Sequence, residues 1–279
     1  MSEPVEVDVS GALSAIDETT PLVNSVTNVV TVNDVANVTL HWGGLPVMSD
    51  DRREVAEMVA SASACYLNMG TVDDEGEATM LTAGEAANEE GLPLVFDPVG
   101  VGATSVRTDV ATTIVSDLDV TVIKGNHAEI SALAGAGGDV RGVESVGEYA
   151  DIAETATALA RETGAVVVAS GVVDVVATAE TAYEVTTGDP MMGQVVGTGC
   201  MLGVTLATFA GGLGLGDELD AALSGTAAFG LAGERAADDG EWNGPASYNV
   251  AFLDAIATMA AEGGEDVDAA DRIERVTSE

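Results

Sequence analysis

The sequence predicts one large α/β domain with a central, mostly parallel β-sheet flanked by helices. Short valine-rich runs alternate with longer alanine-rich runs along the 279 residues, as in parallel sheets that helices cover. Apolar side chains make up 47% of the chain, enough for one large core or two small ones, and we favour one. After residue 199 the pattern becomes largely helical, so the last helices are expected to pack on one face of the sheet.

Each expected element follows from such a run. Strands are expected at residues 65–69, 94–97, 120–124, 165–170 and 173–177. Helices are expected at residues 31–42, 51–62, 77–90, 108–116, 128–134, 146–162, 200–210, 218–237 and 246–261. The single domain is expected to span residues 19–262. Residues 1–18 and 263–279 are acidic and aperiodic, which predicts a flexible N-terminus and a loosely held C-terminal tail.

The charge of the chain limits its partners. Nine basic residues oppose 47 acidic ones, which gives a formal net charge of −38, and the acidic residues are spread through the sequence. Long-range repulsion disfavours nucleic acid and anionic membranes, and leaves small molecules or copies of this chain as partners. Such an acid excess indicates adaptation to high salt, in which counterions screen the self-repulsion. An ordinary acidic protein is the alternative.

Cysteine usage and the N-terminus predict a cytoplasmic protein. Cys65 and Cys200 are the only cysteines, and neither has the spacing of a CxxC pair or a metal site, which fits a reduced compartment. The first residues include Glu3, Glu6 and Asp8 instead of a basic segment followed by an apolar one, so we expect no secretory signal. No apolar run approaches the length of a membrane span.

Residues 193–203, GQVVGTGCMLG, are the most informative stretch. A strand-like run at residues 194–196 leads into glycines and then into a helix. Gly197 and Gly199 let a ligand approach the backbone, and the free N–H groups and the dipole of the helix favour an anion. Cys200 lies at the same positive end, where the pKa of a thiol is lowered, so it is a candidate base or charge-sensing group. A plain tight turn is the alternative.

Asp97 ends a buried strand and precedes the glycine-rich segment PVGVGAT. Open α/β sheets bind their ligands at such strand ends, and a flexible glycine loop can wrap a substrate or a phosphate. Asp97 is therefore expected to point toward a site. The alternative is that the Asp97-Pro98 pair simply begins a turn.

The next strand ends in the same way, at KGNHAE, residues 124–129. Lys124 is the only lysine of the chain and is a candidate for binding phosphate, although a surface lysine among acidic neighbours is the alternative. Asn126 and Glu129 have the spacing of a reciprocal helix cap. Glu129 equally fits a hydrated Mg²⁺ near Asp97, because this ion takes one or two carboxylates together with waters and substrate phosphates.

Two residues near the start of the chain are candidates for binding a heterocycle. Asn28 offers both a donor and an acceptor, and Met48 offers an adaptable apolar wall. A helix cap for Asn28 and a core position for Met48 are the alternatives.

Taken in order, seven segments resemble the hydroxyethylthiazole kinase family of thiamine salvage. They are PLVNSVTN, GGLPVMS, LPLVFDPVGVGAT, VTVIKGNHAEISALAG, a strand ending in ASG, VVGTGCMLG and GPASYNVAFLDAI, spread over residues 20–260. The resemblance implies a ribokinase-like fold and transfer of the γ-phosphate of ATP to the hydroxyl of 4-methyl-5-(2-hydroxyethyl)thiazole. It also implies a homotrimer with sites between subunits.

The resemblance assigns roles to the residues above. It implies that Asn28 and Met48 line the thiazole pocket, and that the turn from Gly197 through Gly199 to Cys200 closes over the substrate hydroxyl. It implies that two carboxylates organise Mg²⁺ while three polar residues approach the ATP phosphates, these being Asp97 and Glu129, and Lys124, Asn126 and Ser170. Three positions depart from the family, which usually has His, Arg and Thr where this chain has Asn24, Lys124 and Ser170.

The chemistry agrees with this resemblance, because phosphoryl transfer needs alignment and charge neutralisation more than covalent help. Related sugar kinases have an aspartate where Cys200 lies, and a thiolate is a weak substitute as a base, so Cys200 is expected to orient the hydroxyl more than to deprotonate it. Two other functions are a non-catalytic thiazole-binding regulator and another ribokinase-like kinase, such as a hydroxymethylpyrimidine kinase.

Overall fold

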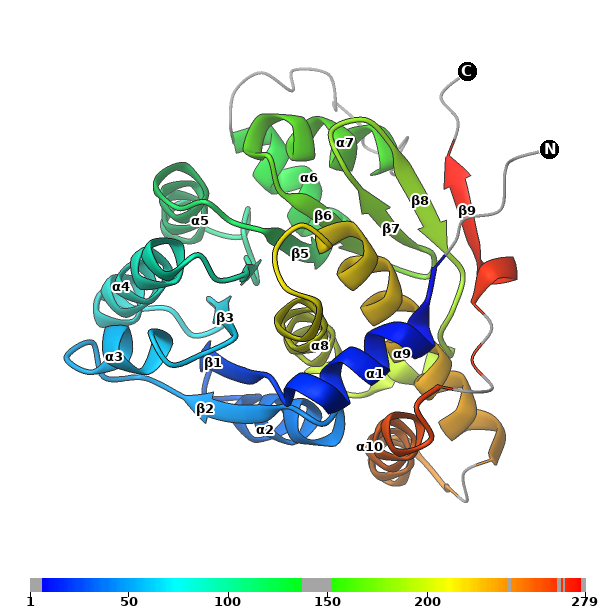
Figure 1. Ribbon diagram of the computed structural model, residues 1–279. Helices are drawn as coiled ribbons and strands as arrows, with labels where there is room; N and C mark the ends of the chain where they lie inside the picture. The colour runs from blue at the N-terminus through cyan, green and yellow to red at the C-terminus, as the bar shows by residue number, and fades with distance from the viewer. Residues whose placement is uncertain (1–6, 137–151, 240–241, 265–266, 268, 277–279) are drawn as a thin grey trace.

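The computed structural model describes residues 7–136, 152–239, 242–264, 267 and 269–276 (Figure 1). In this part of the chain one sheet of nine strands runs through the molecule in the order β2-β1-β3-β4-β5-β6-β7-β8-β9. Strands β1 to β6 pair in parallel, and β7 to β9 continue the sheet in antiparallel fashion. The strands are β1 Leu22–Val26, β2 Leu45–Met48, β3 Ala64–Asn68, β4 Leu94–Asp97, β5 Val122–Asn126, β6 Val166–Ser170, β7 Asp174–Ala177, β8 Ala182–Val185 and β9 Ile273–Val276.

Helices cover both faces of this sheet, as the mostly parallel order requires. The helices are α1 Val9–Thr19, α2 Val32–His41, α3 Val55–Val59, α4 Asp74–Glu90, α5 Ser105–Asp117, α6 His127–Ala136, α7 Ile152–Thr163, α8 Thr198–Leu213, α9 Glu218–Asp239 and α10 Pro245–Ala261. Helices α1, α2, α8, α9 and α10 share one apolar core, and α3 to α7 share the other. Because strand residues alternate between faces, Tyr66 joins the first core while its neighbours Cys65 and Leu67 join the second.

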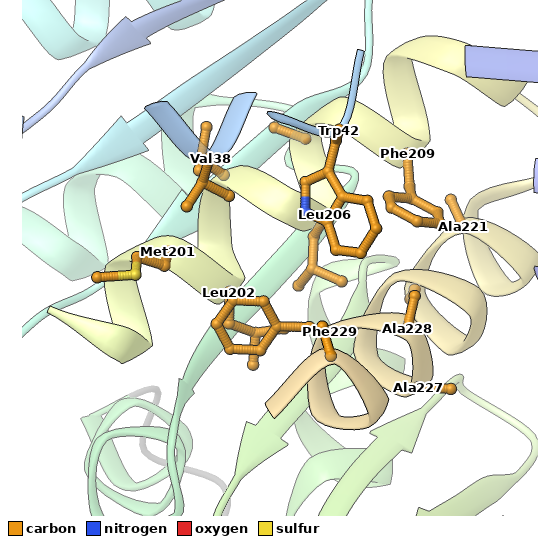
Figure 2. Packing of buried hydrophobic residues seen from close by; sticks show 14 of the residues in the cluster. Val38, Trp42, Met201, Leu202, Leu206, Phe209, Ala221, Ala227, Ala228 and Phe229 are labelled. Atoms are coloured by element: carbon orange, nitrogen blue, oxygen red, sulfur yellow. The ribbon is translucent and has the colours of Figure 1, made fainter. Parts of the chain in front are cut away.

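Helix α8 is the centre of the first core. Most of its residues are buried, because it packs against β1, β3, β4 and β5 on one side and against α1, α2 and α9 on the other. Figure 2 shows Trp42 and Phe209 meeting edge to face beside α8 and α9, and their ring centroids are 5.3 Å apart. The Trp42 indole N–H donates to Thr205 Oγ1 at 2.9 Å, so the one polar atom of that ring is satisfied.

Most of the predicted elements are present, but their bounds and several strands differ. The expected helix at 51–62 is reduced to α3, and β1, β2, β8 and β9 were not predicted as strands. The expected strand-like run at 194–196 is wrong, because residue 194 ends a 3₁₀ turn at Pro190–Gln194 and residues 195–197 form a bend and a turn before α8. Residues 146–151 of the expected helix at 146–162 lie outside the described residues, and α7 accounts for the rest.

Two segments near the ends of the chain are held more firmly than expected. Residues 9–18 belong to α1, which begins where an Asp8 carboxylate oxygen accepts the Gly11 N–H at 2.7 Å. Val9, Leu13 and Ile16 of α1 are buried in the first core. At the other end, β9 pairs with β8. The prediction of loose ends was wrong for these segments, because the buried side of α1 is short and β9 gains its order only by pairing with a strand far away in sequence.

Candidate functional site

The candidate site lies where the parallel strands end and α8 begins. Four polar residues each occupy the last position of a strand: Asn68 in β3, Asp97 in β4, Asn126 in β5 and Ser170 in β6. The strand register brings them together in pairs, because Asn68 lies beside Asp97 and Asn126 lies beside Ser170. This carboxyl edge is where open α/β sheets bind ligands.

Asp97 is fully buried at this edge. Its Oδ2 accepts hydrogen bonds from Tyr66 Oη at 3.0 Å and from Asn68 Nδ2 at 2.9 Å, whereas its Oδ1 has no hydrogen-bond partner. Burial raises the pKa of the Asp97 carboxyl to about 6, the charge of Lys124 opposes this shift, and the charge of Glu129 adds to it. A buried carboxylate with one oxygen left over is suited to bind a cation or a ligand.

Lys124 is buried beneath the start of α8, so the alternative of a surface lysine was wrong. Its Nζ lies 3.6 Å from Asp97 Oδ1. A Cβ atom added at Gly199 would lie 3.0 Å from the same Nζ, which shows how closely the lysine approaches the first turn of α8. The ammonium and the helix N-terminus therefore direct positive charge to one place.

The first turn of α8 is built around Gly197. This glycine has φ of +95°, a conformation that other residues rarely adopt, and a Cβ there would lie 2.7 Å from Thr31 Cγ2. The helical hydrogen bonds begin with Met201 N donating to Gly197 O. As at any helix start, the preceding N–H groups have no partner within the helix, which makes this end an anion-binding geometry.

Cys200 lies in the same turn, and its sulfur faces two side-chain amides. Asn68 Nδ2 is 3.3 Å and Asn28 Nδ2 is 3.5 Å from Cys200 Sγ. The sequence predicts Cys200 at the helix start and Asn28 near a ligand, but only the fold brings the two together. The sulfur is thus a hydrogen-bond acceptor in a buried polar cluster.

Asn28 fixes the chain just before α2, and its predicted role in binding a heterocycle stays a prediction. Its Oδ1 accepts the N–H groups of Val30 and Thr31, both at 3.0 Å, which holds the chain just before α2. Its Nδ2 donates to Asn68 Oδ1 at 2.8 Å and joins the cluster around Cys200. Met48 ends β2, pairs in register with Ser25 and is partly buried against the first core, so it lies one strand further out.

Asn126 and Glu129 form the reciprocal cap that their spacing predicts. Glu129 N donates to Asn126 Oδ1 at 2.9 Å, and Asn126 N donates to Glu129 Oε2 at 2.8 Å. Glu129 Oε1 also accepts the Gly100 N–H at 2.8 Å, which ties the loop after β4 to α6. Ser170 Oγ donates to Gly125 O at 3.3 Å across the β5–β6 pair.

Among the described residues, no group of three or more His, Cys, Asp and Glu side chains is placed to hold a metal ion. The carboxylates of Asp97 and Glu129 are therefore expected to act with waters and substrate oxygens if they bind Mg²⁺. The reciprocal cap explains the position of Glu129 without a metal ion. The role of Glu129 as a Mg²⁺ ligand stays a prediction.

Three residues of the site are not predicted by the sequence. Tyr66 and Asn68 are polar groups inside an otherwise apolar strand, and that interruption was the available signal. Arg107 donates to the carbonyl oxygens of Met69 and Gly70 at 2.9 Å each and thereby fixes the loop after β3. It also donates to Val99 O at 2.6 Å in the loop after β4, and nothing in the local sequence distinguishes it from a surface arginine.

Known proteins share this architecture and sequence. The profile of the hydroxyethylthiazole kinase family matches residues 13–262. Hydroxyethylthiazole kinase of Natronomonas pharaonis is 66% identical over 272 residues, which are 98% of this chain and 97% of that protein. Hydroxyethylthiazole kinase of a Thermoanaerobacter species is 46% identical over 250 residues, 90% of this chain and 94% of the relative.

Solved structures agree with these sequence matches. The structure of a hydroxyethylthiazole kinase from Pyrococcus horikoshii OT3 superimposes with a TM-score of 0.84 at 34% identity and covers 96% of this chain and 99% of its own. A ribokinase-like protein from Enterococcus faecalis has a TM-score of 0.63 at 11% identity, covering 94% and 92%, and supports the fold alone. The predicted ribokinase-like α/β class is thereby confirmed. No helix in the described part is long and apolar enough to cross a membrane. The sequence, the fold and these relatives together show that the chain belongs to the hydroxyethylthiazole kinase family.

Proposed function

We propose that this chain transfers the γ-phosphate of ATP to the hydroxyl of 4-methyl-5-(2-hydroxyethyl)thiazole. The observation that carries the proposal is the meeting of Lys124, Asp97 and Cys200 at the open start of α8. A transferring phosphoryl group needs positive charge and alignment, and the lysine and the free N–H groups of the helix supply both. The family membership specifies the alcohol.

On this proposal the thiazole is bound beside the start of α8. Asn28 and Met48 line its pocket, and the backbone at Gly197 and Gly199 closes over the hydroxyl. The close approaches at both glycines support this, because a side chain at Gly197 would collide with Thr31 and one at Gly199 would press on Lys124. The reacting oxygen then faces Cys200, whose sulfur orients the hydroxyl and accepts its proton weakly.

The nucleotide phosphates are proposed to lie along the ends of β5 and β6. Lys124, Asn126 and Ser170 occur there, and the register that pairs Asn126 with Ser170 supports a shared binding edge. A lysine in place of the family's usual arginine keeps the charge and loses bidentate geometry, so Lys124 acts as a point charge.

The donors present fit Mg²⁺. Asp97 Oδ1 is a buried carboxylate oxygen without a hydrogen-bond partner, and an oxygen of this kind is the ligand that magnesium prefers. Glu129 is the proposed second carboxylate, since each of its oxygens accepts one backbone N–H and keeps a lone pair. When bound, Mg²⁺ neutralises phosphate charge, while Asp97 and Glu129 keep their positions through their hydrogen bonds.

We further propose a cytoplasmic homotrimer with sites between subunits, adapted to high salt and without nucleic-acid partners. Three exposed valines support the assembly: Val29 and Val30 are 78% and 66% exposed, and Val196 is 77% exposed. They flank Asn28 and Gly197, so the apolar surface adjoins the proposed thiazole site. Sedimentation in molar KCl is expected to show a trimer, and a fully active monomer would refute the shared site.

The decisive experiment incubates the pure protein with the thiazole alcohol and Mg-ATP in molar KCl. Mass spectrometry is expected to detect thiazole phosphate and ADP. Thiazole binding without product would instead support the non-catalytic regulator. Phosphorylation of a hydroxymethylpyrimidine in preference to the thiazole would support the other ribokinase-like activity.

A further inference from the structure

We infer that Asn68 is a positioning residue, whose amide fixes the Cys200 sulfur and the Asp97 carboxylate relative to each other. The inference rests on the phosphoryl transfer proposed above. Asn68 is the last residue of β3 and is 4% exposed, with β1 on one side of the strand and β4 on the other. From there its side chain reaches groups that belong to separate elements.

The backbone determines which way the Asn68 amide points. Its Oδ1 accepts the Gly70 N–H at 3.0 Å. The Nδ2 group must therefore face the opposite direction, where it donates to Asp97 Oδ2 at 2.9 Å and lies 3.3 Å from Cys200 Sγ. A single amide thus contacts both the proposed metal-binding carboxylate and the sulfur expected to face the hydroxyl.

Backbone N–H groups also orient the Asn28 amide, and this second amide contacts the same sulfur from another side. Because its Oδ1 accepts the N–H groups of Val30 and Thr31, its Nδ2 is directed at Asn68 Oδ1 and at Cys200 Sγ. Asn28 Nδ2 also donates to Thr31 Oγ1 at 2.8 Å, and Asn68 Nδ2 to Tyr66 Oη at 2.9 Å, so oxygen acceptors take the shorter hydrogen bonds of both amides. The sulfur lies against both amide nitrogens, and these contacts hold its position from two sides before any substrate arrives.

The carboxylate is controlled in a similar way. Asn68 Nδ2 and Tyr66 Oη both donate to Asp97 Oδ2, and this leaves Oδ1 as the oxygen nearest Lys124 and without a hydrogen bond. Asn68 consequently helps decide which carboxylate oxygen is available to a ligand. Small misplacements of reacting groups, of about 1 Å, cost roughly 10²-fold in rate.

The test compares Asn68→Ala and the isosteric Asn68→Asp, which removes the donors, with wild type in molar KCl. Asn88→Ala is the matched control, because among the described residues the Asn88 amide bonds to the backbone of Asp119, next to the amino end of β5, whereas the polar cluster lies at the carboxyl ends of the strands. Both Asn68 variants are expected to lower kcat by about 10²-fold, to raise the Mg²⁺ concentration for half-maximal rate, and to change KM for ATP little. Asn88→Ala is expected to keep wild-type kcat.

A second variant separates positioning from structure. In a Cys200→Ala background, Asn68→Ala is expected to lower kcat by a smaller factor than in wild type, because part of its effect passes through the sulfur. Equal factors in the two backgrounds, an unchanged kcat, or loss of folding in both Asn68 variants would each overturn the assignment.

Thiol labelling keeps the inference testable apart from turnover. Asn68→Ala is expected to change the rate at which Cys200 reacts with iodoacetamide, whereas an unchanged rate would count against it. Cys65 is the internal control, since it is fully buried on the other face of the sheet and burial raises its pKa to about 12. If wild type forms no thiazole phosphate, the proposed function fails, and the labelling rates still decide the role of Asn68.

Discussion

Two ion pairs in different regions of the sheet differ in what surrounds them. Lys124 and Asp97 lie at the ends of the parallel strands, with side chains 4% and 0% exposed, a distance of 3.6 Å and one carboxylate oxygen without a hydrogen bond. Arg272 and Glu234 tie the 3₁₀ turn Ala270–Arg272, just before β9, to α9, with side chains 35% and 26% exposed. Both Glu234 oxygens have partners in Arg272 or Gly188. The exposed pair is complete by itself, whereas the buried pair leaves an acceptor unused.

Physical chemistry explains why the incomplete pair is the better candidate for a functional role. Removing two charges from water costs several kcal/mol per ion, and an imperfect contact does not recover all of it. The exposed pair avoids most of that cost and contributes about 0–1 kcal/mol. The buried pair therefore weakens the free protein relative to an apolar core, and a ligand that uses its spare oxygen and its ammonium offsets the loss.

Replacing Lys124 is expected to change stability and turnover more than any other change considered for the two ion pairs. Lys124→Met leaves Asp97 buried without a counter-charge, which is expected to cost about 3–5 kcal/mol of unfolding free energy. Turnover is expected to fall below detection, since the phosphate loses its cation. Denaturant unfolding and product formation measure the two effects.

Lys124→Arg serves as the control for that variant. It keeps the charge, and is expected to retain measurable turnover and most of the stability. If Lys124→Met unfolds at the wild-type denaturant concentration, the buried pair does not have the energetic role given to it here.

Changing the salt concentration is expected to have the next largest effect on stability and activity. Salt screens the charges on the surface more than those of the buried pair. With a net charge of −38 per chain, self-repulsion is weakly screened when the Debye length is about 10 Å, at 0.1 M salt, and strongly screened near 3 Å, at 1 M. The melting temperature and the activity are expected to rise together with KCl. A melting temperature that does not change from about 0.1 to 2 M would rule out adaptation to salt by surface charge.

Cys200 is expected to have a moderate effect. Cys200→Ala should lower kcat by less than the roughly 10²- to 10⁴-fold typical of a general base, because positioning and charge neutralisation supply most of the rate. Cys200→Asp should retain or raise kcat, since the helix N-terminus and two amides favour a carboxylate there. A Cys200→Asp protein that folds and binds thiazole but has no activity would reclassify Cys200 as a packing residue.

The exposed pair is expected to give the smallest effect. Glu234→Gln should lower the unfolding free energy by about 1 kcal/mol or less and leave kcat unchanged, because β9 is remote from the ends of the parallel strands. Stability loss as large as that of Lys124→Met would remove the distinction between the two regions.

The sequence predicted site residues best where a charged side chain follows directly on an apolar, strand-like run. Asp97 and Lys124 each end an apolar run that stops at a turn or a glycine, so their place at the carboxyl edge could be predicted from local sequence. Gly197 was recognisable because the turn before a helix needs a glycine, whereas Gly199 lies inside the first turn of α8. The Glu129 cap followed from its spacing to Asn126, which is a purely local interaction.

The contacts that complete the site were not predictable in the same way. Asn68 and Cys200 are 132 residues apart in the chain, and only the packing of α8 on β3 joins them. The short strands β1, β2 and β9 were missed because each is ordered by its neighbour in the sheet more than by its own composition. Propensity describes a segment alone, and these segments depend on distant partners.

The closeness of α8 to β3 has a consequence for how this site can change over generations. A Cβ atom at Gly203 would lie only 2.6 Å from the Tyr66 hydroxyl, whose oxygen is 3.1 Å from the Cys200 carbonyl oxygen. Any larger residue at position 203 would push away the helix whose first turn is proposed to receive the anion, unless position 66 became smaller at the same time. The two positions are thus expected to co-vary among descendants of this chain. A larger side chain at one position would be matched by a smaller one at the other, while the first turn of α8 stays in place.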